Sequence, residues 1–563
     1  MRICGLKLTH DATVAVINDG KLELSVELEK MYNQPRYSKM QDLREIEDVL
    51  ARFDLRSYDI DLWVVDGWKH EAISVKGGPI RVAPYHENDP ADGEDHDLFE
   101  RFSFTPGSSS YRHVAGHVMS AYATSPWSKM QKPAHVLVWD GGMQPRVYYV
   151  NPPAMRCHRV QFGTIGELYG TLYSTMGLFF GPYKRQEVIN YTGEDWYTIL
   201  KTYCDYSLAG KLMAYIGDGL SWCGRYSVEY LIEKMMECCE EVGHRANIER
   251  NTLAYDNHRR VDFQFLRGIY DFATRGWHDK TILAAIHTMC ERMLVKGLER
   301  LVPKSSPLCF VGGSALNIKW NSAIRRAGYD LWVPPFPNDC GTAIGQAALE
   351  MLYQTGRWHL DWSVYSGPPL LPPPIVTQAN GWDVRTCSLA TLAEFLSLNP
   401  SEPVVFLLGR AEIGPRALGH RSILMSAIAA ENKATLNRIK GRESFRPVAP
   451  ICLAEYAEEY FDPGRADPYM LFDHKVREEA RCRIPAVLHD DGTARLQTVT
   501  HTHSPELYEL LSEYGARSGV PVLCNTSAND SGKGFFPDVE SAMRWGKVDH
   551  IWSNGFLYSK KEV

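Results

Sequence analysis

The sequence predicts an α/β protein built from two domains. Short apolar runs that end in glycine pairs alternate with longer segments in which apolar residues recur every three or four positions, as in strands followed by helices. One proline-rich stretch interrupts this alternation roughly two thirds of the way along the chain. Because 563 residues exceed what a single hydrophobic core usually serves, we expect a domain on each side of that stretch.

The first elements should form a three-stranded antiparallel meander. Residues 2–8, 12–17 and 21–28 are strand-like apolar runs, and Asn18-Asp19-Gly20 separates the last two. Such a turn between alternating apolar runs is a strong hairpin signal, because Asn, Asp and Gly tolerate positive φ. We therefore expect the chain to begin with a sheet.

Two later apolar runs, 134–139 and 308–311, also have strand character. They end in Gly141-Gly142 and Gly312-Gly313, and residues 280–301 between them have helical spacing. Glycines after a strand let the backbone approach a phosphate, although a tight turn is the simpler explanation of either pair alone.

A proline-rich segment marks the expected domain boundary. SGPPLLPPPIVT contains five prolines, so we expect a first domain over 1–365, a connector over 366–380 and a second domain over 381–563. The leucines and isoleucine of this segment leave an ordered strap across one domain as the alternative.

Charge and composition exclude several classes of protein. With a net charge of -7 the chain has no overall attraction for nucleic acid or anionic membranes, and no apolar run reaches the roughly 18 residues that span a bilayer. The N-terminus lacks a secretion signal, and 13 cysteines without a CxxC pair fit reduced thiols. We expect a cytoplasmic protein without nucleic-acid or membrane partners. Its acidic residues 86–100 lack calcium-loop spacing and should form a solvated loop.

Cations gather between residues 405 and 450 in the pattern of a buried anion site. They stand beside glycine and proline turns and are Arg410, Arg416, Arg421, Lys440, Arg442 and Arg446. Guanidinium forks match phosphate and carboxylate oxygens, and Gly414 would let the backbone approach such a ligand. Arg495 and the turn Asn525-Thr526-Ser527 are further candidates for binding oxyanions. A structural ion-pair cluster is the alternative.

A second set of residues could bind a metal ion. His113 and His117 are four positions apart, so both imidazoles would project from one face of a helix, although such a pair alone is more often structural. Asp140 follows a predicted strand and Asp339 precedes a predicted helix, and both could add carboxylate oxygens. This mixed set suits divalent iron, manganese or zinc. His10 is either an acid-base group or a plain hydrogen-bonded histidine.

These segments together resemble the O-carbamoyltransferases of nodulation and antibiotic tailoring, the NodU/CmcH family. The most specific segments are GPRALGHRSIL, NRIKGRESFRPVAP, HDDGTARLQTV and NTSAN, which occur here in that order. LTHDATVAV, HxxxH, DGG, GGSALN and NDCGTAIGQAAL are similar to blocks nearer the N-terminus. The resemblance covers almost the whole chain.

The resemblance implies both a fold and a reaction. The fold would be an actin-like N-terminal domain with duplicated RNase H-like halves, followed by a YrdC-like domain. The C-terminal domain would make carbamoyl adenylate from carbamoyl phosphate and ATP, a step that depends on charge stabilisation by fixed cations. The N-terminal domain would transfer the carbamoyl group to a hydroxyl of a small natural product, as in antibiotic biosynthesis. An enclosed passage would protect the labile adenylate from water.

The resemblance also implies a role for each candidate residue. Carbamoyl phosphate and ATP would be bound by Arg416, Lys440, Arg446, Arg495, Asn525 and Ser527, with Lys440 and Arg495 acting in catalysis. The adenylate would contact Asp140, Gly142, Gly312, Gly313 and Asn317. Fe²⁺ would be held by His113, His117, Asp140 and Asp339. His10 would be the base that activates the acceptor hydroxyl.

The sequence departs from the family pattern at three places. DGGMQ stands where many relatives have DGxGE, NTSAN stands for NTSFN, and EKMYNQPRYSK replaces a basic segment, which leaves the roles of Arg36 and Lys39 open. We expect this last segment to shape the choice of acceptor, which no motif identifies.

Three rival functions explain less of the sequence. A hydrogenase-maturation carbamoyltransferase should carry paired CxxC motifs and an acylphosphatase-like module, and neither occurs here. An ATP-dependent sugar kinase leaves the C-terminal cations unexplained. A non-catalytic scaffold would not need two complete sets of ligands.

Overall fold

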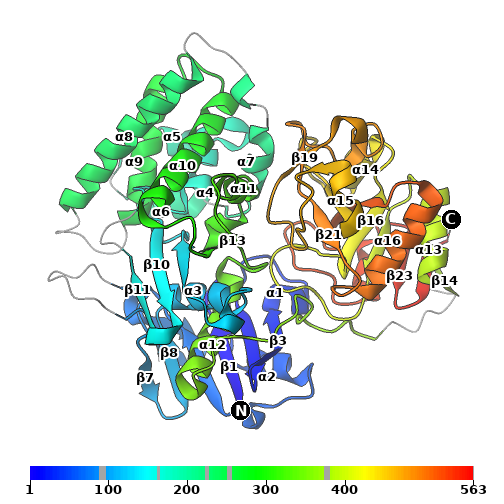
Figure 1. Ribbon diagram of the computed structural model, residues 1–563, viewed down its shortest axis with the longest axis horizontal. Helices are drawn as coiled ribbons and strands as arrows, with labels where there is room; N and C mark the ends of the chain where they lie inside the picture. Colours follow the sequence, from blue (N-terminus) through cyan, green and yellow to red (C-terminus); the bar gives the residue numbers. More distant parts are fainter. Residues whose placement is uncertain are drawn as a thin grey trace. The chain divides into compact units, whose positions relative to one another are not determined.

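The computed structural model describes residues 1–87, 97–160, 165–193, 195–203, 205–217, 219–221, 227–249, 257–372 and 381–561. The chain divides into two compact units (Figure 1). Unit 1 comprises Met1–His86, Glu100–Thr124 and Pro334–Val563, and unit 2 comprises Glu87–Phe99 and Ser125–Val333. Both contain mixed sheets with helices, which confirms the α/β class. Most of the predicted acidic loop lies outside the described residues.

The first sheet of unit 1 has six strands in the order β3-β2-β1-β4-β8-β7. These are β1 (Arg2–Lys7), β2 (Thr13–Asn18), β3 (Lys21–Glu27), β4 (Leu62–Asp66), β7 (Phe102–Thr105) and β8 (Ser108–Tyr111). β1, β2 and β3 are antiparallel, whereas β4 and β8 continue the sheet parallel to β1. Asp19 and Gly20 have φ values of 46° and 84°, so the left-handed turn of the predicted meander is confirmed.

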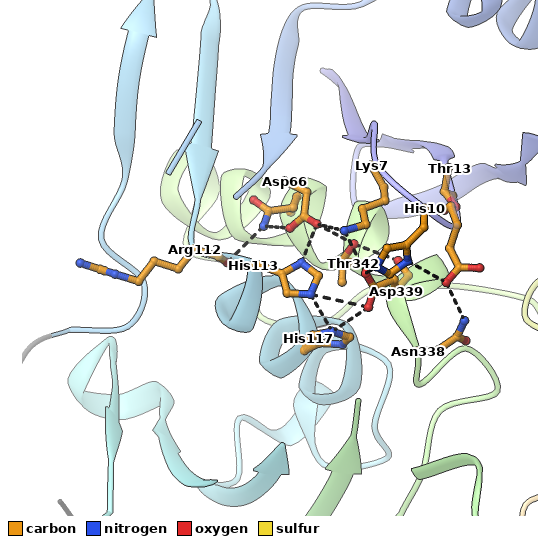
Figure 2. Close-up of polar contacts among 12 residues, drawn as sticks. Lys7, His10, Thr13, Asp66, Arg112, His113, His117, Asn338, Asp339 and Thr342 are labelled. Atoms are coloured by element: carbon orange, nitrogen blue, oxygen red, sulfur yellow. Dashed lines mark hydrogen bonds and ion pairs between the residues drawn. The ribbon is translucent and has the colours of Figure 1, made fainter. Parts of the chain in front are cut away.

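Helices α3 (His113–Ala123) and α12 (Thr342–Thr355) pack against each other, and α12 packs on β1, β2 and β4. A Cβ atom at Gly345 would lie 1.8 Å from the carbonyl oxygen of Gly116, so only glycine permits this approach. The smaller elements nearby are α1 (Leu28–Tyr32), α2 (Arg44–Ala51), β5 (Ala72–Val75) and β6 (Gly78–Arg81). The close packing brings the start of α3 and the segment before α12 to the ends of β1 and β4 (Figure 2).

The sheet of unit 2 has the order β11-β10-β9-β12-β13. Its strands are β9 (Ala134–Val138), β10 (Arg146–Asn151), β11 (Arg156–Arg159), β12 (Leu308–Val311) and β13 (Leu331–Trp332). As in the first sheet, three antiparallel strands are followed by two that run parallel to the first of them. This repeated order is the duplication that the actin-like prediction requires.

Helices make up most of the rest of unit 2. They are α4 (Leu172–Phe179), α5 (Gln186–Ile189), α6 (Trp196–Tyr203), α7 (Leu208–Ile216), α8 (Val228–Glu249), α9 (Asn257–Ala273), α10 (Asp279–Leu301) and α11 (Ile318–Arg326). α10 confirms the helix predicted over 280–301 and packs on α7 and α8.

The C-terminal part of unit 1 is built on an eight-stranded sheet of order β14-β24-β23-β15-β16-β22-β17-β21. The strands are β14 (Trp382–Thr386), β15 (Val404–Leu407), β16 (Arg421–Ser426), β17 (Ala449–Leu453), β21 (Gln497–Val499), β22 (Val522–Ser527), β23 (His550–Ser553) and β24 (Phe556–Lys560). Val405 and Leu407 pack in one core, and Val404 and Phe406 in another, so both faces of β15 are buried. The assignment of this part as YrdC-like stays a prediction.

A smaller sheet and five helices complete the C-terminal part. The sheet has β18 (Phe461–Asp462), β19 (His474–Val476) and β20 (Thr493–Ala494). The helices are α13 (Leu389–Leu398), α14 (Glu431–Ile439), α15 (Ala457–Tyr460), α16 (Pro505–Ser518) and α17 (Val539–Trp545).

The described part of the proline-rich segment is an ordered strap. The amides of Gly367 and Leu370 donate to the carbonyls of Ala411 and Gly409, and that of Leu371 donates to Pro537. Residues 373–380 lie outside the described residues, and the domain boundary at 366–380 stays a prediction. Among the described helices, none has both the length and the apolar character needed to cross a membrane.

Candidate functional site

Three of the predicted metal ligands meet in unit 1. The Nε2 atoms of His113 and His117 are 3.2 Å apart, and they lie 3.6 and 3.4 Å from Oδ1 of Asp339 (Figure 2). All three side chains are buried, and their ligand atoms lie within 4.8 Å of one another. Two imidazoles and a carboxylate converging on one point fit a divalent first-row transition metal better than a structural histidine pair.

Asp66, which the sequence interpretation missed, orients this set. Its Oδ2 lies 2.7 Å from Nδ1 of His113, and it also accepts hydrogen bonds from Thr342 and Gln346 at 3.1 and 2.8 Å. A carboxylate on Nδ1 fixes the tautomer whose Nε2 is free to bind a metal. The available signal was an acid at the end of the apolar run LWVVD, which forms β4 beside β1.

Lys7 is a second residue that sequence reasoning missed. Its Nζ lies 2.9 Å from Oδ2 of Asp339 and 3.2 Å from Oδ2 of Asp66, and its side chain is only 1 % exposed. Burial disfavours the charged form, but the two carboxylates raise the pKa of Lys7 above its usual value. Burial alone would raise the pKa of Asp339, but the charges of Lys7 and His113 outweigh burial and hold that pKa well below the usual range.

His10 lies at the edge of the same cluster. Its Nε2 is 3.5 Å from Oδ2 of Asp339, its Nδ1 is 3.4 Å from Asp11, and its side chain is 36 % exposed. Burial lowers the pKa of His10, but Asp339 and Asp11 outweigh it and raise that pKa. A partly exposed histidine beside a buried ligand set is well placed to meet an incoming hydroxyl group.

The predicted adenylate-binding residues lie in unit 2, where two loops end the parallel strands β9 and β12. The amide of Gly313 donates to Oδ1 of Asp140 at 3.0 Å, and Gly142 follows in the same loop. Gly312 has φ 95°, and a Cβ there would lie 2.5 Å from the carbonyl oxygen of Trp139. Asn317 caps α11 by accepting from the amides of Lys319 and Trp320.

The arginines predicted to bind anions come from separate segments of unit 1 and lie close enough to repel one another. Burial and mutual repulsion lower the pKa of Arg442 to about 9 and that of Arg416 to about 10, and hold the pKa of Arg495 well below its usual value. Arg446 and Arg36 contribute to this repulsion. The buried Nε atoms of Arg416 and Arg495 have no hydrogen-bond partner among the described residues. Arg446 forms an ion pair with Glu443 at 3.8 Å, but the unpartnered Nε atoms and the mutual repulsion of the other arginines favour an anion site over an ion-pair cluster.

The other residues predicted to bind carbamoyl phosphate and ATP, Lys440, Asn525 and Ser527, lie in the NTSAN turn or are hydrogen-bonded to it. Nζ of Lys440 donates to the carbonyl oxygens of Ser527 and Asn529 and, at 2.7 Å, to the side-chain oxygen of Asn529. Asn525 donates to the side chain of Gln497 at 2.9 Å. Arg442 donates to Thr526 at 3.2 Å, so one arginine of the cluster is hydrogen-bonded to the turn.

The family follows from comparison with known proteins. A model described as carbamoyltransferase N-terminus matches residues 2–349, and one described as carbamoyltransferase C-terminus matches residues 396–560. The chain belongs to the carbamoyltransferase family. Like its relatives, it is a transferase.

Two relatives show how far this carbamoyltransferase resembles characterised proteins. It is 42 % identical to nodulation protein U of Bradyrhizobium diazoefficiens over 100 % of this chain and 98 % of the relative. It is 29 % identical to 3'-hydroxymethylcephem-O-carbamoyltransferase of Streptomyces clavuligerus over 97 % of this chain and 96 % of the relative.

A solved structure, an activator of 2-hydroxyisocaproyl-CoA dehydratase from Clostridium difficile with bound ADPNP, is also similar. It covers 63 % of this chain and 97 % of its own, with 13 % identity and a TM-score of 0.34. A likeness this distant carries no functional conclusion.

Two of the predicted anion-binding cations support the backbone instead: Arg421, which ends the motif GPRALGHR, and Arg410, which precedes it. Arg410 donates to the carbonyl oxygens of Gly367 and Glu23, and Arg421 donates to those of Leu408 and Gly409. Gly414 is required for packing, because a Cβ there would lie 2.2 Å from the carbonyl oxygen of Pro335, and its approach to a ligand stays a prediction.

Proposed function

We propose that this carbamoyltransferase activates carbamoyl phosphate with ATP at the arginine cluster and transfers the carbamoyl group to a hydroxyl at the histidine site. The observation that carries this proposal is that unit 1 contains two different groups of residues. One is a cluster of mutually repelling arginines, in which the Nε atoms of Arg416 and Arg495 have no hydrogen-bond partner among the described residues, and the other is the compact ligand set His113, His117 and Asp339. One set suits polyanions and the other suits a metal, so a two-step reaction uses both.

In the first step we expect carbamoyl adenylate to form. Water releases phosphate from carbamoyl phosphate, a carbamate oxygen attacks the α-phosphorus of ATP, and pyrophosphate leaves. Arg416, Arg446 and Arg495 would hold the anionic oxygens, and their fixed positions would stabilise charge without reorganisation. Lys440 would position Asn525 and Ser527 through its bonds to the NTSAN turn.

In the second step the acceptor hydroxyl oxygen attacks the carbamoyl carbon and AMP leaves. His10 would accept the hydroxyl proton, since it is the partly exposed base of the cluster. Gly142, Gly312, Gly313 and Asn317 are proposed to contact the adenylate.

His113, His117 and Asp339 would hold a divalent ion, proposed as Fe²⁺, that polarises the phosphate oxygens when bound. We propose Asp140 as the fourth metal ligand, because its place after a strand predicts a carboxylate there. Its substitution by Asn should weaken metal binding if this assignment is right.

The acceptor class is proposed from the relatives. The cephem relative is named for carbamoylating a hydroxymethyl group. Several other relatives that match this chain along its length share the name nodulation protein U, which does not name an acceptor. We therefore propose a hydroxyl group of a small natural product as acceptor.

Pyrophosphate exchange tests the activation step. Protein incubated with ATP, carbamoyl phosphate and labelled pyrophosphate, under reducing conditions with Fe²⁺, should incorporate label into ATP only when carbamoyl phosphate is present. Formation of ADP without exchange would instead favour a kinase and remove the adenylation proposal.

A further inference from the structure

A buried lysine lies directly behind the carboxylate that faces the two histidines. Lys7 is the last residue of β1, and its ammonium lies beside Asp66 and Asp339 (Figure 2). The centroid of the Trp68 ring is 4.0 Å from Nζ. With 1 % of its side chain exposed, Lys7 cannot turn toward solvent without opening the site. The position of the charge is therefore fixed.

The two oxygens of Asp339 have different partners. Oδ1 faces the Nε2 atoms of His113 and His117, whereas Oδ2 lies 2.9 Å from Nζ of Lys7. The backbone of Asp339 is also held, because Thr342 donates to its carbonyl oxygen at 2.9 Å. The ion pair with Lys7 holds Oδ2 toward the ammonium and away from the histidines, so it opposes chelation of one ion by both oxygens.

We propose that Lys7 is a positioning residue that limits Asp339 to coordination through Oδ1 and so keeps one position of the metal open for substrate. This inference rests on the metal site proposed above. Catalytic metal sites bind their substrates at a position that the protein leaves open. A chelating Asp339 would fill that position.

The charge of Lys7 supports the same role. Lys7 bridges Asp339 and Asp66, the carboxylate that binds Nδ1 of His113, so one cation neutralises part of the negative charge around the ligand set. Partners of metal ligands tune both ligand orientation and metal charge. With Lys7 present, a bound ion would retain more of its positive charge for substrate oxygens.

Cobalt substitution in the full chain tests this role. In Lys7→Met we expect Co²⁺ to bind at least as tightly as in the wild type, because a nearby positive charge is lost. The visible absorption of bound Co²⁺ should weaken severalfold as the coordination number rises. Transfer to acceptor should fall about tenfold or more, while carbamoyl-phosphate-dependent pyrophosphate exchange should persist and report an intact fold.

Lys30→Met is the matched control. Lys30 is also a buried lysine, paired with Glu27 at 2.7 Å, and its other partners are the carbonyl oxygens of Glu412 and Gly414. Its substitution should leave the cobalt spectrum unchanged.

Two outcomes separate the inference from the site on which it rests. Weaker cobalt binding by Lys7→Met with the band intensity of the wild type would show that Lys7 only stabilises the fold, and would overturn the inference. Failure of the wild type to bind Co²⁺ would remove the metal site itself. If Lys7→Met does not fold, Lys7→Gln supplies the same comparison, because it also removes the charge.

Discussion

At the scale of single residues, two arginines of the motif GPRALGHR have opposite energetic roles. Arg416 is a desolvated cation repelled by Arg36 and Arg446, and burial with this repulsion lowers its pKa to about 10. Arg421 is more deeply buried, and burial also lowers its pKa to about 10, but it is not repelled by a cluster of cations and donates to several backbone carbonyl oxygens. One motif therefore contains an arginine that we propose binds an anion, Arg416, and an arginine that supports the backbone, Arg421.

We expect Arg416→Met to stabilise the ligand-free protein by about 1–2 kcal/mol, because a buried like charge is removed. The same variant should lose most of the thermal stabilisation that pyrophosphate gives the wild type. Arg421→Met is the matched substitution and should destabilise by about 2–3 kcal/mol, since it leaves buried carbonyl groups unpaired. Thermal unfolding with and without pyrophosphate measures the stability of each variant and its stabilisation by the anion. If both substitutions stabilised the protein, or both destabilised it, the different roles assigned to the two arginines would be contradicted.

Glu29 provides a prediction about pH. Burial is the main cause that raises its pKa to about 7, with Arg36 opposing and Asp11 adding to the rise. A carboxyl group whose folded pKa lies above its unfolded value favours folding at low pH, and this contribution is lost as pH rises from about 4.3 through about 7. Glu29→Gln should therefore gain on the order of 2–3 kcal/mol relative to the wild type between pH 5 and pH 8. An equal difference in melting temperature at both pH values would contradict this pKa.

Residue spacing predicts only part of the metal site. His113 and His117 are recognisable because four positions make one helical turn, and Asp339 because it precedes a helix. Lys7 had no such signal, and Asp66 had only its place at the end of an apolar strand, where a lysine or aspartate usually meets solvent. Their burial depends on α12, a helix far along the sequence that packs on β1 and β4.

At the scale of elements, the closeness of α3 and α12 determines whether the ligands meet. Gly345→Ala would place a Cβ 1.8 Å from the carbonyl oxygen of Gly116 and push the helices apart. We expect a loss of about 1–3 kcal/mol in stability and weaker binding of Co²⁺. Gly210→Ala is the control, because a Cβ on this residue of α7 meets nothing within 4 Å. A Gly345→Ala variant that binds cobalt like the wild type would contradict the role assigned to this packing.

Local patterns predicted individual strands and helices better than their assembly. The meander, the strand Leu308–Val311 and the helix Asp279–Leu301 followed from turn residues and periodicity. The eight-strand order of the C-terminal sheet pairs β14 with β24, and no local pattern encodes that contact. The strap could not be distinguished from a connector, because proline content alone does not reveal hydrogen bonds to Gly409 and Ala411.

At the scale of the molecule, the end of β3 and the helix α1 that follows it support the loop that carries Arg416. Lys30 donates to the carbonyl oxygens of Glu412 and Gly414 at 2.7 and 2.5 Å, and Glu27 accepts from the amide of Gly414. We expect Lys30→Met to lower the rate of pyrophosphate exchange roughly 10- to 100-fold, because small displacements of binding groups are costly in catalysis. Unchanged exchange in this variant would mean that the arginine loop needs no such support.

If two separate sites each carry out one half of the reaction, a substitution in one site should impair only its own half-reaction. The rates of pyrophosphate exchange and of transfer to the acceptor in two variants test this division. Arg495→Ala removes a buried guanidinium of the arginine cluster, and His113→Ala removes an imidazole of the ligand set. Arg495→Ala should lose carbamoyl-phosphate-dependent pyrophosphate exchange by roughly 100-fold or more. His113→Ala should exchange near the wild-type rate but fail to carbamoylate an acceptor. Loss of the same half-reaction in both variants would contradict the division.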